Sequence, residues 1–364
     1  MKIILSGGGT GGHIYPALSI AQELKERDPQ TDILYVGKKG SLEEKLVQRA
    51  GLDFKTVRVK GLPRKSINMK SVQAIIELLK GTRDAGRILK DFKPDLVVGT
   101  GGYVSAPILL KAQRMSIPTL IQEQNAYPGK TNRLLARKSS YVALSFEEAK
   151  NYFPSQVKPV FTGNPIREDF LTLTKEEARK NLDFDLYEPM VLSFGGSGGQ
   201  EATNEAILSL VELETDPDFQ LVHITGNAHY EKFMARLPED YNKDKYIFLS
   251  YSHEIPSLLS LSSLVVSSPS AIALAEISAV GVGSILIPKP YTAGNHQFYN
   301  AKSYEGAGAS LMIEEKDLTG QRLLNTIYSI IRDKEKQASM AYASTHLGNP
   351  RAVEKIVDLI YELV

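Results

Sequence analysis

Short runs of valine, isoleucine and leucine alternate with longer helical stretches along the whole chain, and this pattern most constrains the fold. Residues 32–36 (DILYV), 96–100 (LVVGT) and 118–122 (PTLIQ) are continuous apolar runs, which are typical of strands covered on both faces in a parallel sheet. Stretches such as 14–27 and 71–90 have helical spacing instead. Strands and helices that alternate in this way build βαβ units. The predicted fold class is therefore α/β with parallel sheets.

The alternation restarts after residues 162–169 (TGNPIRED), whose glycine, asparagine and proline interrupt both periodicities. A length of 364 residues favours two domains. We therefore expect an N-terminal domain over 1–163 and a second domain over 164–345. Residues 346–364 are expected to form a helix that packs back on the N-terminal domain.

Composition excludes several classes of protein. The chain has no cysteine, so disulfide frameworks, thiolate metal sites and a cysteine nucleophile are excluded. Its net charge of +1 gives no reason to expect a nucleic-acid partner. No apolar run reaches the roughly 18–20 residues of a membrane span. The apolar stretch at the start of the sequence is too short for a signal peptide, so a cytoplasmic chain is expected. Two Asp-x-Asp triplets, at 183–185 and 216–218, fall in polar turns, and we expect no metal site.

Two glycine clusters occupy equivalent places in the two halves of the chain. Residues 2–13 (KIILSGGGTGGH) and 190–200 (MVLSFGGSGGQ) both read as a strand with Leu-Ser near its end, then a glycine cluster and a helix, and 96–107 is a looser copy. Glycines in such turns can simply allow close packing of helix on sheet. Two of them in equivalent places favour the binding of ligand phosphates or sugar oxygens near helix N-termini.

The first cluster formally satisfies the dinucleotide fingerprint through Gly7, Gly9 and Gly12. That fingerprint also requires an acidic residue at the end of the second strand, to bind a ribose hydroxyl. The strand instead ends in Gly-Lys-Lys at 37–39, so only an NADP enzyme remains as an alternative. His13 closes the cluster and adds an imidazole, which a pyrophosphate site does not need.

Two polar residues in the second half are candidates for ligand contacts. Glu276 lies in an otherwise apolar helix, where an unpaired carboxylate is costly, so its partner is either a buried cation or the hydroxyls of a ligand such as a ribose. Gln297 lies at the start of the next helix, where its amide can bond sugar hydroxyls.

Seven motifs occur in order along the chain. They are GGGTGGH (7–13), GGYVSAP (101–107), EQNAYPGKTNR (123–133), TGNPIR (162–167), FGGSGGQ (194–200), ALAE (273–276) and NHQFYNA (295–301). Together they resemble the MurG family, the undecaprenyl-diphospho-muramoylpentapeptide β-N-acetylglucosaminyltransferases of peptidoglycan synthesis. The resemblance implies a GT-B fold, in which two Rossmann-like domains face each other across a cleft.

The resemblance implies transfer of GlcNAc from UDP-GlcNAc to the muramoyl 4-hydroxyl of undecaprenyl-diphospho-MurNAc-pentapeptide (lipid I), with inversion, to form lipid II without a cofactor. His13 is the implied general base, with Glu123 as a rival. The chain has Gln122 where the family often has histidine, and Ser268 where it tends to have arginine. The implied UDP-GlcNAc contacts are Thr10, Gly11, Gly12, Asn125, Arg167, Ser197, Ser252, Ala271, Ile272, Ala273, Leu274, Ala275, Glu276 and Gln297.

Residues 58–90 carry nine basic and only two acidic side chains. Val72, Ile75, Ile76 and Leu79 follow helical spacing there, and part of this stripe is expected to pack on the sheet. Apolar residues among lysines in the preceding loop, 62–69, are harder to explain by packing. A lipid-anchored acceptor and the basic segment together predict peripheral binding to an anionic membrane surface at the cytoplasmic side.

Three alternatives remain open from the sequence. They are another GT-B transferase, an NADP oxidoreductase that uses the first glycine cluster, and a non-enzymatic nucleotide-sugar-binding or membrane-scaffold protein.

Overall fold

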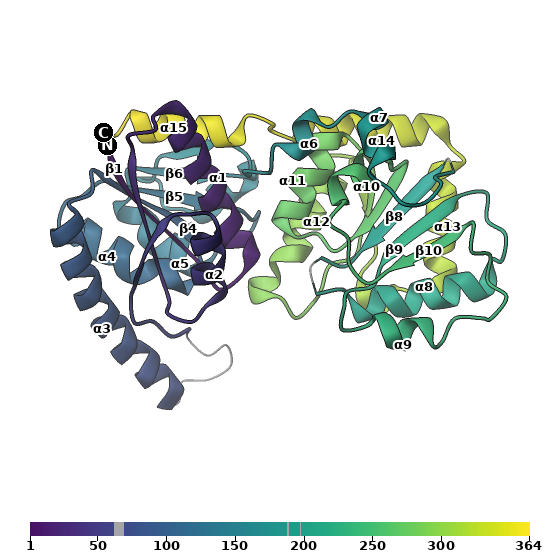
Figure 1. The fold of residues 1–364 in the computed structure, drawn as a ribbon, viewed down its shortest axis with the longest axis horizontal. Coiled ribbons are helices and arrows are strands. Elements are labelled where there is room, and N and C mark those ends of the chain that lie inside the picture. Colours follow the sequence, from purple (N-terminus) through teal and green to yellow (C-terminus); the bar gives the residue numbers. More distant parts are fainter. Residues whose placement is uncertain (62–68, 188, 197) are drawn as a thin grey trace. The chain divides into compact units, whose positions relative to one another are not determined.

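The structure, a computed structural model, describes residues 1–61, 69–187, 189–196 and 198–364. The chain divides into two compact units, which we call the N-terminal unit (Met1–Ile166 with Pro350–Val364) and the C-terminal unit (Arg167–Asn349). Each unit contains one parallel sheet with helices packed around it (Figure 1). The predicted α/β class with two Rossmann-like parallel sheets is therefore confirmed.

The N-terminal sheet has seven strands in the order β3-β2-β1-β4-β5-β6-β7, and all neighbours are parallel. The strand order reverses between β1 and β4, and ligands of such sheets bind outside the carboxyl ends of the strands at that point. The first glycine cluster directly follows β1. The strands are β1 (Lys2–Gly7), β2 (Asp32–Gly37), β3 (Asp53–Thr56), β4 (Leu96–Gly101), β5 (Thr119–Glu123), β6 (Tyr141–Leu144) and β7 (Pro159–Phe161).

Helices of the N-terminal unit bury small and branched apolar side chains on this sheet. In α1 the buried residues Ala17, Ile20, Ala21 and Leu24 repeat at helical spacing and join a core with the strands. Sequence reasoning did not place the shorter α4 and α5. The helices are α1 (Gly11–Arg27), α2 (Leu42–Arg49), α3 (Met69–Phe92), α4 (Ala106–Arg114), α5 (Lys130–Leu135) and α15 (Ala352–Tyr361), with short 3-10 turns at Tyr103–Ser105, Ala136–Lys138 and Glu147–Tyr152.

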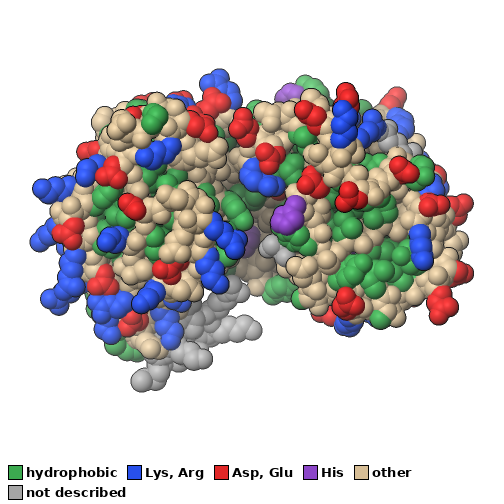
Figure 2. Space-filling view, viewed as in Figure 1, with side chains coloured by type: hydrophobic (Ala, Val, Ile, Leu, Met, Phe, Trp, Pro, Cys, Tyr) green, Lys and Arg blue, Asp and Glu red, His purple; other side chains and the backbone are tan. Residues whose placement is uncertain are grey.

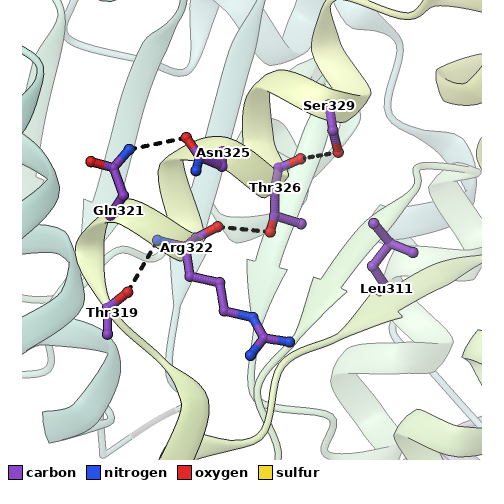
Figure 3. Close-up of a pocket in the computed structure, with 7 residues that line it drawn as sticks. All are labelled: Leu311, Thr319, Gln321, Arg322, Asn325, Thr326 and Ser329. Atoms are coloured by element: carbon purple, nitrogen blue, oxygen red, sulfur yellow. Dashed lines mark hydrogen bonds between the residues drawn. The ribbon is translucent and has the colours of Figure 1, made fainter.

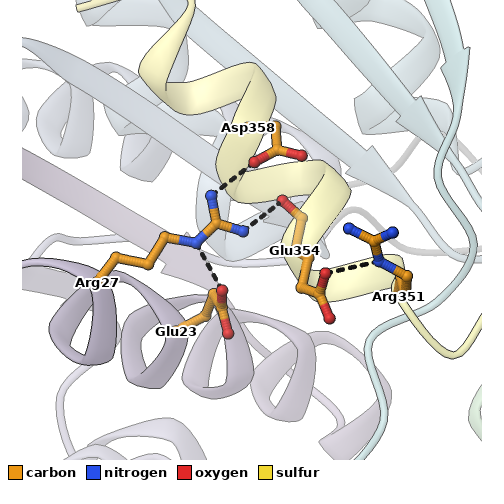
Figure 4. Close-up of polar contacts among 5 residues, drawn as sticks. All are labelled: Glu23, Arg27, Arg351, Glu354 and Asp358. Atoms are coloured by element: carbon orange, nitrogen blue, oxygen red, sulfur yellow. Dashed lines mark hydrogen bonds and ion pairs between the residues drawn. The ribbon is translucent and has the colours of Figure 1, made fainter.

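The last helix, α15, packs against the first helix, α1. Its apolar face, which includes Ile356 and Ile360, belongs to the same buried core as β1 and β2. At the rim, Arg27 of α1 donates to Glu23 at 2.6 Å and to Asp358 of α15 at 2.6 Å (Figure 4). The end of the chain is therefore an integral part of the N-terminal unit.

The apolar stripe of α3 does not pack on the sheet, contrary to the expectation for part of it. Val72, Ile75, Ile76 and Leu79 are each 45–64% exposed. The face that α3 buries instead contains Ala74, Ala85 and Leu89. Helical spacing marks a face but does not say which of two apolar faces meets the core. The expected apolar loop at 62–68, with Arg64 and Lys65, lies outside the described residues.

The C-terminal sheet has six parallel strands in the order β10-β9-β8-β11-β12-β13. Again the order reverses beside the strand that precedes the glycine cluster, β8. The strands are β8 (Met190–Phe194), β9 (Gln220–Ile224), β10 (Tyr246–Leu249), β11 (Leu264–Ser267), β12 (Ser284–Leu286) and β13 (Ser310–Met312). The helices are α6 (Asp169–Thr172), α7 (Lys175–Lys180), α8 (Glu201–Leu213), α9 (Tyr230–Met234), α10 (Ile255–Leu261), α11 (Ala271–Val280), α12 (His296–Gly306), α13 (Gly320–Ile331) and α14 (Lys334–Leu347).

Across the described ranges, no helix is both long enough and apolar enough to cross a bilayer.

Candidate functional site

The first glycine loop (residues 7–12) connects the end of β1 to the start of α1. Its backbone lies so close to β4 that a Cβ on Gly7 would be 2.0 Å from the Thr100 hydroxyl oxygen. Gly9 has a φ of +88°, which favours glycine. Thr10 is the N-cap residue of α1, yet its side chain makes no capping hydrogen bond and is exposed. The loop therefore presents a hydroxyl and the first amides of a helix at the switch point of the sheet.

His13 lies in the first turn of α1, against the backbone of a second glycine pair. A Cβ on Gly101 would be 2.9 Å from the His13 Nδ1 atom, and Gly101 also has a φ of +106°. The Thr100 hydroxyl donates to the His13 carbonyl at 2.6 Å. On the ring, Nδ1 lies 3.1 Å from the Gln124 Oε1 atom. The imidazole is thus held at the carboxyl ends of β1 and β4.

The Glu123 carboxylate organises the loop that follows β5. It accepts hydrogen bonds from the Asn125 backbone N–H at 3.0 Å, the Gly129 N–H at 2.9 Å and the Asn132 amide at 2.8 Å. It also accepts from the Asn125 side chain at 3.2 Å. The side chain is 1% exposed. Both carboxylate oxygens are therefore engaged: Oε1 holds Asn125, and Oε2 holds Gly129 and Asn132.

A buried carboxylate also lies beneath the first glycine loop. Glu43, in the first turn of α2, is 1% exposed. Its two oxygens accept from the Lys38 N–H at 3.3 Å and the Gly9 N–H at 3.5 Å. A Cβ on Gly8 would be 2.8 Å from the Glu43 carboxyl carbon. A negative charge is therefore built in against this loop.

The second glycine loop (residues 195–199) is fastened by a cation instead. The Lys289 ammonium donates to the carbonyl oxygens of Gly195 and Gly199, each at 2.8 Å. Burial lowers the pKa of Lys289, while the negative charge of Glu315 opposes that change. Because C=O and N–H point in opposite directions across a trans peptide, the amides of residues 196 and 200 face away from the ammonium. Ser197, in the middle of this loop, lies outside the described residues.

Lys289 also connects this loop to Gln297. The Gln297 Oε1 atom accepts from the Lys289 backbone N–H at 2.9 Å. That contact identifies the oxygen, because an N–H can only donate. The amide nitrogen of Gln297 is therefore the atom that can donate to a ligand. The side chain is 6% exposed and lies in the first turn of α12.

Glu276 lies in the second turn of α11, whose start is capped by the Ser270 hydroxyl. Burial raises the pKa of Glu276 to about 7, and the positive charge of Arg167 opposes this rise. Among the described residues, the Arg167 guanidinium pairs with the Asp169 carboxylate at 3.9 Å and not with Glu276. A half-buried carboxylate with a distant cation is a group that hydroxyl donors of a ligand can stabilise.

The remaining candidates differ in accessibility. Ala271, Ala273 and Leu274 are buried, whereas Ile272 and Ala275 are partly exposed on α11. Only the backbone at the start of this helix can therefore serve a ligand at the buried positions. Ser252 lies in the loop after β10, and its hydroxyl accepts from the Glu254 N–H at 3.0 Å.

Within each unit the structure brings together part of the predicted set. In the N-terminal unit, Thr10 to His13 and the Asn125 loop meet through the contact between His13 and Gln124. In the C-terminal unit, Lys289 joins the second glycine loop to Gln297. The hydroxyl of Ser252 instead accepts from Glu254, within its own loop.

Sequence reasoning missed three residues that shape these sites, namely Glu43, Gln124 and Lys289. A signal existed for Lys289, because a lone lysine ends the buried run ILIP at 285–288. The dinucleotide fingerprint places its acid at the end of the second strand, whereas Glu43 lies in the first turn of the helix that follows. Gln124 lies in the motif EQNAYPGKTNR (123–133), but nothing in the sequence pairs it with His13.

One shallow pocket lies on the outside of the C-terminal unit, along α13 and β13. Its polar side chains mostly bond to their own helix: Gln321 donates to Asn325 at 3.0 Å, and Thr326 donates to the Arg322 carbonyl at 2.7 Å (Figure 3). None of its lining residues belongs to the seven motifs. Over the part of the chain that the structure describes, no group of three or more His, Asp or Glu residues could hold a metal ion.

Comparison with known proteins identifies the family. The chain matches the glycosyltransferase family 28 N-terminal domain over residues 3–144 and the family 28 C-terminal domain over residues 190–358. Enzymes of Acetivibrio thermocellus and Finegoldia magna, both named UDP-N-acetylglucosamine–N-acetylmuramyl-(pentapeptide) pyrophosphoryl-undecaprenol N-acetylglucosamine transferase, are 42% and 44% identical over 100% of this chain and 98% of each relative. The crystal structure of Acinetobacter baumannii MurG superposes with a TM-score of 0.80 at 26% identity, covering 99% of both chains. The chain therefore belongs to glycosyltransferase family 28 and, within it, to the MurG glycosyltransferases of GT-B fold.

Proposed function

We propose that this protein transfers GlcNAc from UDP-GlcNAc to the muramoyl 4-hydroxyl of lipid I, forming lipid II with inversion at the anomeric carbon. The observation that carries the proposal is the full-length similarity to relatives named for this reaction. The two glycine loops, the His13 imidazole and the carboxyl groups of Glu123 and Glu276, all described above, support it.

In the N-terminal unit, His13 is proposed as the general base that takes the proton of the acceptor hydroxyl. A neutral imidazole suits this step near neutral pH. Glu123, the rival base, already accepts four hydrogen bonds from its own loop. We assign it to positioning Asn125, which would bond the GlcNAc together with Thr10, Gly11 and Gly12.

In the C-terminal unit, the donor nucleotide is proposed to bind along the second glycine loop and the start of α11. Glu276 would accept from the ribose hydroxyls, and Gln297 would donate to a sugar hydroxyl through its amide nitrogen. Arg167, Ser197, Ser252 and the backbone of 271–275 complete the proposed UDP-GlcNAc contacts.

The leaving UDP is proposed to be stabilised by amides and helix N-termini rather than by a bound cation. Activity is therefore expected to survive an excess of EDTA. Loss of turnover in EDTA that added Mg²⁺ or Mn²⁺ restores would contradict this assignment.

The direct experiment measures UDP release from UDP-GlcNAc with and without a lipid-linked muramoyl acceptor. We expect release that depends on the acceptor, together with incorporation of GlcNAc into the lipid. A nucleotide-sugar-binding or scaffold protein would bind UDP-GlcNAc without turnover. An oxidoreductase would bind NADPH in preference to UDP-GlcNAc, and a different GT-B transferase would turn over with another acceptor.

We further propose that α3 and its surroundings hold the protein peripherally on an anionic membrane at the cytoplasmic face. The stripe Val72, Ile75, Ile76 and Leu79 is exposed, and Arg83 and Arg87 are exposed on the same helix. Figure 2 shows Lys and Arg side chains gathered along this edge of the N-terminal unit. Basic residues near an anionic leaflet contribute about 1 kcal/mol each, and buried apolar area adds about 25 cal/mol per Å².

Vesicle pelleting tests this membrane face. The protein is expected to pellet with anionic vesicles, to be released by high salt and to ignore neutral vesicles. The double variants Arg83→Glu with Arg87→Glu, and Ile75→Ser with Leu79→Ser, should each reduce pelleting and leave UDP-GlcNAc binding intact. Lys180→Glu with Lys334→Glu, which changes two exposed lysines of the C-terminal unit, is the matched control. Equal pelleting of all three variants would place the membrane contact elsewhere.

A further inference from the structure

A chain of side-chain amides runs through the N-terminal unit and ends at His13. The Gln122 Nε2 atom donates to the Asn164 Oδ1 atom at 3.2 Å, and the Gln124 Nε2 atom donates to the Gln122 Oε1 atom. The Gln124 Oε1 atom then lies 3.1 Å from the His13 Nδ1 atom. All three amide residues are at most 5% exposed. Polar side chains buried in this way have their orientation fixed by their partners.

The orientation of the Gln124 amide follows from its backbone neighbours. Its Nε2 atom lies 2.6 Å from the Thr100 carbonyl oxygen and 3.3 Å from the Gln122 carbonyl oxygen. Carbonyl oxygens can only accept, so the atom that faces them must be the NH₂ group. The other end of the amide, which faces His13, must therefore be the oxygen.

This orientation determines where the neutral His13 ring carries its proton. The Gln124 oxygen can only accept, so Nδ1 must be the N–H of the ring. Nε2 then carries the lone pair. The backbone of Gly101 and Gly102 lies against the ring. A Cβ on Gly102 would be 3.3 Å from the His13 Cδ2 atom. The ring is thus held in both orientation and tautomer.

We propose that Gln124 is a positioning residue that holds His13 in the tautomer whose Nε2 atom can accept the acceptor proton, with Gln122 bracing Gln124. This inference rests on the proposed function. In the step, the acceptor O–H bond breaks and its proton goes to Nε2, while the oxygen forms a bond to the anomeric carbon. The bond from that carbon to the diphosphate breaks, and its electron pair leaves with UDP. The Nδ1–H bond to Gln124 strengthens as the ring becomes cationic.

The tautomer itself can be measured without any turnover. A long-range ¹H–¹⁵N correlation spectrum of ¹⁵N-histidine-labelled protein, above the titration of His13, should show a protonated-type shift for Nδ1 and an unprotonated-type shift for Nε2. The His13→Gln variant assigns the signals by their loss. The reverse pattern in the unmodified protein would overturn the proposal, whatever the protein's activity.

The kinetic test compares two substitutions of Gln124. Gln124→Leu removes the acceptor, so we expect kcat for UDP release to fall by roughly tenfold to a hundredfold while the Kd of UDP-GlcNAc stays within about twofold, since the wrong tautomer alone is costly in a histidine base. Gln124→Glu keeps an acceptor oxygen at Nδ1 and should retain the tautomer and more of the activity. Gln122→Leu should have a smaller effect, because the two carbonyl contacts of Gln124 remain.

Gln113→Leu is the matched control. Gln113 is another amide of the N-terminal unit, and it donates to the Leu135 carbonyl at 2.9 Å and to the Ser139 hydroxyl at 3.2 Å. If Gln124→Leu lowers kcat no more than this control, or leaves the His13 tautomer unchanged, Gln124 has no positioning role. If the unmodified protein shows the expected tautomer but no turnover of UDP-GlcNAc, the proposed function fails while the structural assignment stands.

Discussion

The two glycine loops of this protein have similar sequences and similar places in their sheets, but opposite charges beneath them. The first loop lies on the Glu43 carboxylate, which accepts from backbone amides. The second loop lies on the Lys289 ammonium, which donates to backbone carbonyls. The negative charge therefore binds peptide N–H groups, whereas the positive charge binds peptide carbonyl oxygens.

This difference separates what each loop can bind. A phosphate near a buried carboxylate is repelled, by roughly 4 kcal/mol at 4 Å for a dielectric constant near 20. Glu43 also accepts from the Gly9 N–H, an amide of the first loop that an anion would need. At the second loop, the Lys289 ammonium binds the carbonyl oxygens of Gly195 and Gly199. The N–H groups of the same two peptides, those of residues 196 and 200, therefore point to the opposite side. The comparison favours a diphosphate at the second loop and uncharged sugar chemistry at the first, and it argues against a dinucleotide at Gly7–Gly12.

The largest expected effect comes from the first loop. His13→Ala should lower kcat by about 10²–10⁴-fold, the usual contribution of a general base. The Kd of UDP should stay within about threefold, because UDP is proposed to bind along the second glycine loop and the start of α11. Single-turnover kinetics and calorimetry separate the two quantities. A Kd of UDP that rises as much as kcat falls would mean that both loops hold UDP.

Glu276 in the C-terminal unit should show the next largest effect. Glu276→Ala should weaken UDP binding by about 2–4 kcal/mol, or tens to hundreds in affinity, through lost charged hydrogen bonds to the ribose. Because the pKa of the unliganded group is about 7, UDP affinity should fall by up to about tenfold per pH unit below 7. The neutral Glu276→Gln variant should lose this pH dependence. Equal UDP affinity in all three proteins would make Glu276 a structural residue.

The same raised pKa predicts an effect on stability with a definite sign. The folded carboxyl binds its proton more tightly than the unfolded one, whose pKa is near 4.5. Stability of the unliganded protein therefore falls as pH rises from about 4.5 to 7. Glu276→Gln should melt at a higher temperature than the unmodified protein at pH 8 and at the same temperature below pH 4.5. A lower melting temperature at pH 8 would show that the charge has a stabilising partner.

Lys289 should have a smaller effect on donor affinity. Lys289→Met removes the charged hydrogen bonds that the ammonium donates to the carbonyls of Gly195 and Gly199. Since a hydrogen bond to a charged group contributes about 1.5–3 kcal/mol, we expect the Kd of UDP to rise about tenfold. Lys316→Met removes an exposed lysine of the same unit and serves as the control. If both variants bind UDP equally well, the charge beneath the second loop has no part in donor binding.

Glu43 should have the smallest effect. Glu43→Gln keeps one acceptor oxygen, so we expect a loss of about 1 kcal/mol in stability and less than about a twofold change in UDP affinity. Titration with UDP and with NADPH measures the outcome. A large gain in affinity for either ligand would show that the carboxylate was keeping a phosphate site closed.

Much of the fold followed from the pattern of apolar runs, because strands buried on both faces leave a clear signature in sequence. The lone acid in the apolar helix α11 also pointed to Glu276, whose pKa the structure raises. The stripe of α3 was assigned in part to the sheet, since spacing identifies a face without its partner. The roles of Glu43, Gln124 and Lys289 could not be predicted from the sequence, because their partners lie 34, 111 and about 90 residues away. Such contacts exist only once the sheets have formed.

The return of α15 to the first helix has a consequence for how the chain is made. Synthesis proceeds from the N-terminus, and domains usually fold as they emerge. Here the core around β1 and α1 includes Ile356, Val357, Leu359 and Ile360. The unit that is translated first is therefore completed last, after the whole C-terminal unit has left the ribosome. Until then the apolar face of α1 that α15 covers stays open to solvent and chaperones, so a ribosome that stops short of the last helix releases a chain with an unfinished first half.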